Sequence, residues 1–267
     1  MNIDVYHFLL FIFGACWGSF LNVCIIRVSN GKSIILPSSS CFECNNKINF
    51  FDKIPILSWI LLLGKCRCKM VKIPKIYLFM ELFVAVLTLC IVFAYSLSPL
   101  SLIYGIFFSL LIVGSGVDIK QKWIPDTVTI GGIFFGLVCS YIFPKLHGCE
   151  INFDSLILSI KGFLVGSSIL LFVGIIGKLI LKTDAMGMGD VKLLGAIGTF
   201  VGIEGIFFCL FTASLIALII SQILFFMKKR SFRDEIPFGP YLSVSCIIWI
   251  LFNLSNLNLF TFGNLFY

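Results

Sequence analysis

Two aspartates are the residues of this sequence that could most plainly do chemistry together. Asp118 ends the apolar run of residues 109 to 117, and Asp190 closes the loop Gly187-Met188-Gly189-Asp190 before another apolar run. A carboxylate beside lipid is costly, so each of these side chains needs a reason to be there. Two carboxyl groups that meet could act as an acid and base pair, one activating water and the other protonating a scissile carbonyl.

Some of the acidic residues could instead have a purely structural role at helix ends. Asp190 could be an N-cap acid that is stabilised by the helix it precedes, and Gly187 and Gly189 allow close approach of another chain or a positive φ. Asp126 is expected at a helix N-terminus, where the helix dipole favours its charge. Asp118 is harder to account for in this way, because it lies at a helix C-terminus and its sequence neighbours supply no compensating dipole.

The elements that must position these residues are membrane helices. The 267 residues are 59% hydrophobic and 12% charged, with a mean hydropathy of +1.07, whereas soluble domains carry about 25% charged residues. A helix that crosses a bilayer needs roughly 17 to 25 apolar residues. We therefore predict an all-α polytopic membrane protein with about eight transmembrane helices, at about 5–26, 76–96, 100–117, 127–143, 156–181, 206–227 and 237–254, with a shorter one at 191–203.

The distribution of basic residues predicts the orientation. The first run is not a cleavable signal peptide, because no basic residue precedes it, and we interpret it as an anchor with its N-terminus outside. With eight crossings, eighteen of the twenty lysines and arginines fall in cytoplasmic connections and leave only Lys145 and Lys161 outside. Both Asp118 and Asp190 then lie on the cytoplasmic side. Topology and contact with anionic lipid account for the net charge of +7, and no nucleic-acid binding is expected.

Residues 28–75 form the one sizeable soluble piece, between a first anchor at 1–27 and a transmembrane domain at 76–267 that carries both aspartates. Within it, Cys41-x-x-Cys44 and Cys66-x-Cys68 make two close thiol pairs, a spacing that favours a structural zinc site. Binding zinc would also supply much of the folding free energy of so short a segment. The alternatives are reduced thiols on a basic loop or a redox pair, and a cytoplasmic location disfavours a disulfide.

An ordered series of motifs resembles the prepilin leader peptidases, bifunctional peptidase and N-methyltransferase enzymes of the GxGD class of intramembrane aspartyl proteases. The matching motifs, in order, are Gly18-Ser19-Phe20-Leu21-Asn22-Val23 with Arg27, Cys41-x-x-Cys44, Lys53 to Trp59 with Gly64-Lys65-Cys66-Arg67, Tyr77 to Glu81, Asp118 with Ile124-Pro125-Asp126, Gly187 to Leu193, and Pro237-Phe238-Gly239-Pro240-Tyr241. The sequence departs from the family pattern at Cys66-x-Cys68, which is one residue shorter than the family's second pair, and at Ile76 and Leu78.

The resemblance implies that Asp118 and Asp190 are the catalytic pair, with Gly187, Gly189, Lys192, Glu81 and Asp126 as supporting residues. It implies cleavage of the basic leader of prepilins or pseudopilins, after a glycine, on the cytoplasmic side of a bacterial inner or plasma membrane. The substrates would serve type IV pili, type II secretion or competence. It also implies methylation of the new N-terminus from S-adenosylmethionine, with zinc held by Cys41, Cys44, Cys66 and Cys68.

Two other classes of protein remain as alternatives. A proton- or cation-coupled transporter could use the same two acids, although many transporters have helices broken within the membrane, and no such break is evident in the sequence. A membrane redox protein would need the cysteine pairs to cycle to disulfides, which the cytoplasmic placement disfavours.

Overall fold

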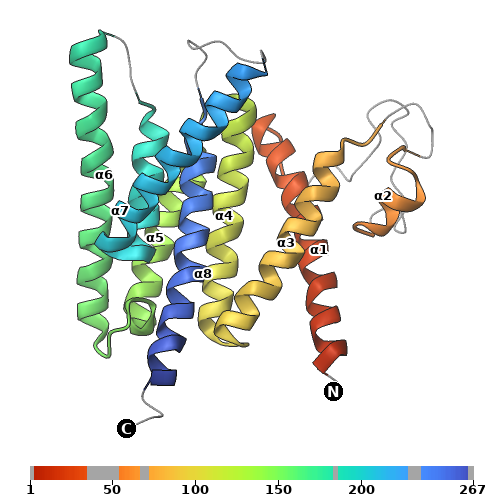
Figure 1. The fold of residues 1–267 in the computed structure, drawn as a ribbon, viewed down its shortest axis with the longest axis horizontal. Helices are drawn as coiled ribbons and strands as arrows, with labels where there is room; N and C mark the ends of the chain where they lie inside the picture. The colour runs from red at the N-terminus through yellow and green to blue at the C-terminus, as the bar shows by residue number, and fades with distance from the viewer. Residues whose placement is uncertain (1–2, 35–53, 67–71, 183–185, 228–235, 264–267) are drawn as a thin grey trace. The chain divides into compact units, whose positions relative to one another are not determined.

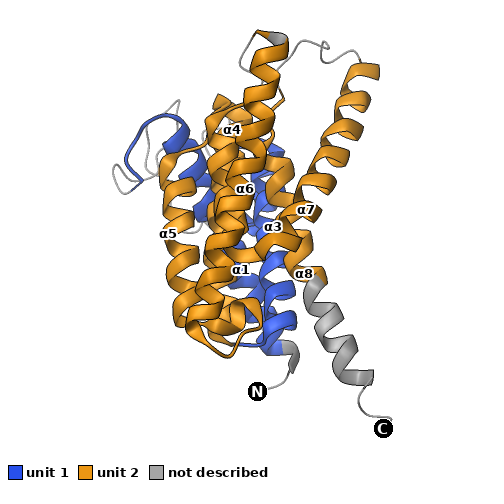
Figure 2. Cartoon of the chain, turned by 90° about the vertical axis from the view of Figure 1, so that its left-hand side faces the viewer, with its two compact units in different colours: residues 1–97 blue, residues 98–267 orange. Residues whose placement is uncertain are grey.

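The computed structural model describes residues 3–34, 54–66, 72–182, 186–227 and 236–263. Over these residues every regular element is a helix, and one isolated β-bridge joins Lys65 and Lys72, which confirms the predicted all-α class. The chain divides into unit 1, Met1–Leu97, and unit 2, Ser98–Tyr267 (Figure 2). The division into segments 1–27, 28–75 and 76–267 stays a prediction.

Five helices are long and apolar enough to cross a membrane, so the chain fits a multi-pass membrane protein. They are α1 (Ile3–Ser29), α3 (Lys75–Tyr95), α4 (Pro99–Gln121), α6 (Asn152–Leu181) and α7 (Met188–Phe226). Two apolar helices are shorter, α5 (Asp126–Ile142) and the part of α8 (Gly239–Gly263) that ends at Phe252. The predicted apolar runs therefore coincide with helices. By length and composition, however, five of the described helices could each cross a membrane, which is fewer than the predicted eight.

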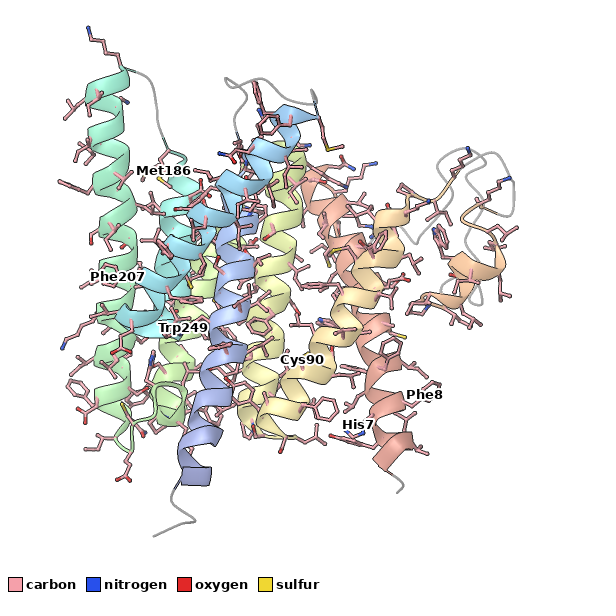
Figure 3. The ribbon with its side chains drawn as sticks, viewed as in Figure 1. His7, Phe8, Cys90, Met186, Phe207 and Trp249 are labelled. Carbon is pink, nitrogen blue, oxygen red and sulfur yellow. The ribbon has the colours of Figure 1, made fainter. Side chains whose placement is uncertain are left out.

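Unit 1 is built on the contact of α1 with α3, together with the short helix α2 (Leu57–Leu61). Glycines let the two long helices approach closely: a Cβ added at Gly14 would lie 2.8 Å from Ala85 Cα, and one at Gly18 would lie 2.9 Å from Glu81 Cα. Small residues at helix contacts are the usual means of close packing in membranes. Near the start of α1 and the end of α3, His7 stacks on Phe93 with ring centroids 4.7 Å apart (Figure 3).

Unit 2 is organised around α7, which contacts α5, α6 and α8, while α4 packs against α8. The contact between α6 and α7 brings main chains together, because a Cβ added at Gly162 would collide with the carbonyl of Gly198, and the reverse also holds. Between α4 and α7, Phe107 stacks on Phe200 with centroids 3.7 Å apart. These contacts fix the position of the first part of α7 among its neighbours.

Helix α7 is interrupted at Gly202, where φ is 67° and ψ is −169°. The chain reverses there (Figure 1), and Met186, before the first arm, lies nearer one end of the unit than Phe207, after the reversal (Figure 3). The predicted runs 191–203 and 206–227 are therefore the two arms of α7. A conformation with this φ and ψ is essentially restricted to glycine.

The interruption at Gly202 frees the Thr199 carbonyl from the helix, and two side chains hydrogen-bond to this carbonyl. The hydroxyl of Ser159 on α6 donates to the Thr199 carbonyl at 2.9 Å, and His147 Nε2 lies 3.1 Å from the same oxygen. His147 belongs to the 3-10 helix η2 (Pro144–His147). Desolvation by burial lowers the pKa of His147, and its hydrogen bond to Thr199 opposes this shift. The neutral ring with a proton on Nε2 fits this contact, because a carbonyl only accepts.

The reversal places several chain segments at one end of unit 2. The C-terminal ends of α4 and α6, both ends of α7 and the start of α8 lie together there (Figure 1). Asp118 belongs to the last turn of α4 and Asp190 to the first turn of α7, so this end carries both. The fold thus assembles the candidate site from residues more than seventy positions apart in the sequence.

Candidate active site

Asp118 is buried near the end of α4, with 5% of its surface exposed. The backbone N–H of Gly239, the first residue of α8, donates to its Oδ2 at 3.1 Å. A helix N-terminus carries partial positive charge and unpaired N–H groups, which favour a carboxylate. The local sequence predicted no compensating dipole for Asp118, and this was wrong, because α8 supplies one from 121 residues further along the chain.

Asp190 is the third residue of α7, and its backbone N–H donates to the Gly187 carbonyl at 3.1 Å. Its side chain makes no capping hydrogen bond, so the N-cap alternative does not describe it, although its charge still lies in the first turn. Its Oδ1 is buried and accepts no hydrogen bond from any residue that the structure describes. A buried carboxylate oxygen without a donor is costly, which leaves this atom ready for a proton, water or substrate.

The two carboxyl groups are close enough to interact electrostatically. Ile124, which is 7% exposed, packs between the elements that carry them. A Cβ added at Gly239 would lie 3.0 Å from Ile124 Cδ1, and one at Gly189 would lie 3.3 Å from Ile124 Cβ. The first turns of α7 and α8 thus both pack against the Ile124 side chain.

Gly187 and Gly189 serve different contacts. Neither is among the glycines with a positive φ, so close approach, and not an unusual backbone conformation, accounts for both. Gly189 faces Ile124, whereas the nearest described atom to a Cβ at Gly187 would be Asp190 Oδ2 at 3.5 Å. Gly187 is also exposed, so it leaves room beside the Asp190 carboxyl group. That room would suit the backbone of a peptide substrate.

Asp126 and Lys192 pair with each other. Lys192 Nζ lies 2.7 Å from Asp126 Oδ1, and their side chains are 38% and 65% exposed, Lys192 being the less exposed. The ion pair joins the first turn of α5 to the first turn of α7. The pair links two helix ends, but an exposed pair of this kind contributes only about 0 to 1 kcal/mol to stability. Asp126 is also the first residue of its helix, as predicted.

Glu81 lies in unit 1, on α3, and is 8% exposed. Its Oε2 accepts the backbone N–H of Ile56 at 2.7 Å, and the Ser19 side chain also hydrogen-bonds to it. Nearby, Asn22 Nδ2 donates to the Tyr77 carbonyl at 3.2 Å. The motif residues of α1 and the predicted supporting residue Glu81 therefore fasten the segment around Ile56 to the α1 and α3 pair.

Three of the four predicted zinc ligands, Cys41, Cys44 and Cys68, lie outside the described residues. Cys66 is half-buried and follows Lys65, which pairs with Lys72 in the β-bridge; beside it the Ile73 N–H donates to the Gly64 carbonyl at 2.8 Å. Within the described part of the chain, no three histidine, cysteine or acidic side chains are grouped to hold a metal.

Some functional residues were not singled out from the sequence. Gly239 and Ile124 were noted only as members of longer motifs, yet Gly239 donates to Asp118 and Ile124 separates the helix starts. Their contacts join segments far apart in the sequence, so no local spacing could have indicated them. The glycine between Phe238 and Pro240 was the one signal available.

Comparisons with known proteins identify the family. Residues 12–95 match the Bacterial Peptidase A24 N-terminal domain, and residues 105–222 match the Type IV leader peptidase family. A Type 4 prepilin-like proteins leader peptide-processing enzyme from Escherichia coli O78:H11 (strain H10407 / ETEC) is 32% identical, over 89% of this chain and 90% of its own length. Prepilin leader peptidase/N-methyltransferases from Neisseria gonorrhoeae and Aeromonas salmonicida are 30% and 29% identical, over 92% of this chain and 89% and 91% of theirs, respectively.

No solved structure matches the chain. The two family matches follow one another along the chain, and the relatives cover nearly all of it. The resemblance inferred from the ordered motifs is therefore confirmed. The chain belongs to the type IV leader peptidase family and is an enzyme of that family.

Proposed function

We propose that the chain is a membrane aspartyl endopeptidase that removes the leader peptide of type IV prepilin-like proteins. The observation that carries the proposal is that two acidic residues lie at one end of unit 2 and interact electrostatically, Asp118 held by a helix N-terminus and Asp190 with a buried oxygen that lacks a described donor. The printed names of the relatives support the substrate class. The exposed Gly187 beside Asp190 supports access for a peptide backbone.

We assign a different role to each carboxyl group, on the basis of its contacts. The Gly239 N–H stabilises the ionised form of Asp118, which makes Asp118 the base that takes a proton from water. Two neighbouring carboxyl groups share one proton more easily than they both ionise, so Asp190 is the protonated partner. Water oxygen attacks the scissile carbonyl carbon as Asp190 gives its proton to the carbonyl oxygen. Asp118 then protonates the leaving amide nitrogen, Asp190 regains its proton, and the C–N bond breaks.

We further propose that the catalytic end of unit 2 faces the cytoplasm of a bacterial inner or plasma membrane, with the N-terminus outside. Counting the two arms of α7 separately gives eight crossings in all. Basic residues support this orientation, because the helix ends beside Asp118 and Asp190 carry Lys120, Lys122, Lys178, Lys182 and Lys192. Large apolar side chains such as Phe172 and Leu179 are 64% and 74% exposed, which suits contact with lipid. Reporter fusions after residues 148 and 182 should report opposite sides of the membrane.

Methyl transfer to the new N-terminus, from S-adenosylmethionine, is the second activity that we propose. The names of two relatives, which include N-methyltransferase, support it. Prepilins or pseudopilins would be the substrates of both activities, in pilus assembly, type II secretion or competence. Mass spectrometry of a co-expressed prepilin reads both steps, because cleavage and an added methyl group change the mass of the mature N-terminal peptide independently.

We also infer that residues 28–75, the insert between the first two long helices, bind zinc through Cys41, Cys44, Cys66 and Cys68. The thiol spacing supports this, and so does the antiparallel β-bridge between Lys65 and Lys72, because Cys66 directly follows Lys65. Four thiolates form a closed tetrahedral site, which suits a structural role. Elemental analysis of the purified protein should find about one zinc per chain, and Cys41→Ser with Cys44→Ser should lose it.

Conservative substitution of the aspartates tests the peptidase. Asp118→Asn and Asp190→Asn should each abolish removal of the leader from a co-expressed prepilin, while the amount of protein in the membrane stays normal. Asp154→Asn, in the first turn of α6, is the matched control and should process normally. Normal processing by either dyad variant would contradict the assignment. Ion-dependent uptake with no change in leader length would favour the transporter alternative.

A further inference from the structure

Two serines, Ser243 buried and Ser115 half-buried, lie one turn from Asp118 and Gly239, at the contact of α4 with α8. Ser243 on α8 is 3% exposed, and its hydroxyl lies 2.9 Å from the Gly239 carbonyl oxygen. Its Oγ also lies 2.8 Å from the Oγ of Ser115 on α4. Ser115 in turn lies 2.7 Å from the Leu111 carbonyl of its own helix. The peptidase mechanism above uses neither hydroxyl.

These contacts close a ring that includes the catalytic carboxyl group. The Gly239 N–H donates to Asp118, the Gly239 carbonyl accepts from Ser243, and Ser243 Oγ accepts from Ser115. Ser115 and Asp118 are three residues apart on α4, which places them on the same face of that helix. The ring therefore joins the start of α8 to the last turns of α4 at two levels.

We propose that Ser243 and Ser115 are positioning residues that aim the Gly239 N–H at Asp118. The inference rests on the proposed peptidase function and adds the contacts that hold the proposed base, Asp118, in position. The first residue of a helix has no intrahelical partner for its N–H, so its direction depends on outside contacts. Ser243, which accepts a hydrogen bond from Ser115 of α4, donates to the Gly239 carbonyl and so supplies one such contact on the other side of the same residue.

Satisfaction of the hydroxyls alone does not explain the arrangement. Each serine has a carbonyl acceptor one turn earlier in its own helix, Gly239 for Ser243 and Leu111 for Ser115. Because Ser115 has a single hydroxyl proton, the Leu111 carbonyl and Ser243 Oγ compete for it, and donation to Ser243 is the contact that crosses between helices. Ser245, which is fully buried on α8, bonds in the same way to the Tyr241 carbonyl at 2.8 Å and provides a matched control.

The kinetic test compares Ser243→Ala with Ser245→Ala in purified full-length enzyme acting on a prepilin. We expect kcat of Ser243→Ala to fall about three- to tenfold, the equivalent of one net hydrogen bond. KM should stay within about twofold, because the substrate does not touch this residue in the proposed arrangement. Ser245→Ala should keep both constants. The double variant Ser115→Ala with Ser243→Ala should be no slower than the slower single variant, because both act through one contact.

Hydrogen exchange at the Gly239 amide supplies a readout that does not depend on cleavage. This amide should exchange faster in Ser243→Ala than in the wild type, and Ser245→Ala should match the wild type. Equal exchange in both variants, equal kcat, or additive losses in the double variant would overturn the proposal. A wild-type protein that cleaves no prepilin would instead overturn the proposed function, and the exchange comparison would still decide the positioning role.

Discussion

Replacing Gly239 with alanine should slow catalysis severely without unfolding the protein. A Cβ at this position would lie 2.8 Å from Asp118 Oδ2 and 3.0 Å from Ile124 Cδ1. Gly239 is not among the residues with positive φ, so alanine suits the backbone there. The strain therefore falls on the Asp118 carboxyl group and on Ile124, and the backbone itself has no reason to move.

The size of the effect follows from the distances. Carbon and oxygen atoms in contact usually lie about 3.3 to 3.6 Å apart, so Oδ2 must retreat by about half an ångström or more. The hydrogen bond from the Gly239 N–H, 3.1 Å in the wild type, would then exceed the usual limit of about 3.2 Å. Losing a hydrogen bond to a charged group costs about 1.5 to 3 kcal/mol, which corresponds to roughly ten- to 150-fold in kcat.

Alanine substitutions at two other glycines provide a milder case and a control. Gly189→Ala would place its Cβ 3.3 Å from Ile124 Cβ, a milder crowding that should cost less than Gly239→Ala. A Cβ at Gly131, on α5, meets no described atom within 4 Å, so Gly131→Ala is the control and should cleave normally. Initial rates of prepilin cleavage by purified variants give the comparison. If folded Gly239→Ala cleaved as fast as Gly131→Ala, the contact between α8 and Asp118 would have no catalytic role.

Three further predictions concern structure away from the dyad. Glu81→Ala removes the acceptor for the Ile56 N–H and should speed limited proteolysis of the insert, whereas Glu81→Gln keeps an acceptor oxygen and should resemble the wild type. Gly202→Ala should lower stability by about 1 to 3 kcal/mol, because its backbone conformation is essentially restricted to glycine, and thermal unfolding in detergent measures the loss. Burial lowers the pKa of His147 in the folded protein below the ordinary histidine value of 6.5. As the pH falls below 6.5, the unfolded chain therefore binds a proton at His147 before the folded protein does. The free energy of unfolding should decrease as the pH falls below 6.5, and His147→Gln should weaken this pH dependence.

The sequence alone was sufficient for much of this protein's architecture. Apolar runs became helices because lipid offers no hydrogen-bond partner, so the backbone must satisfy itself within each segment. The runs 191–203 and 206–227 correspond to the two arms of α7, although the interruption lies at Gly202, inside the first run, where a φ of 67° suits glycine. The two aspartates could be identified because a carboxyl group at the end of an apolar run is rare, and their motifs indicated the family that the relatives confirmed.

Only the tertiary structure decided what surrounds those aspartates. The donor to Asp118 comes from Gly239, the acceptor role of Glu81 depends on Ile56, and the spacing of the helix starts depends on Ile124. A helix C-terminus is a poor place for a negative charge by itself, and the sequence around Asp118 predicted no relief. Relief came from the start of another helix, because the packing of distant segments, and not the order of neighbouring residues, determines which dipoles and N–H groups a buried carboxylate meets.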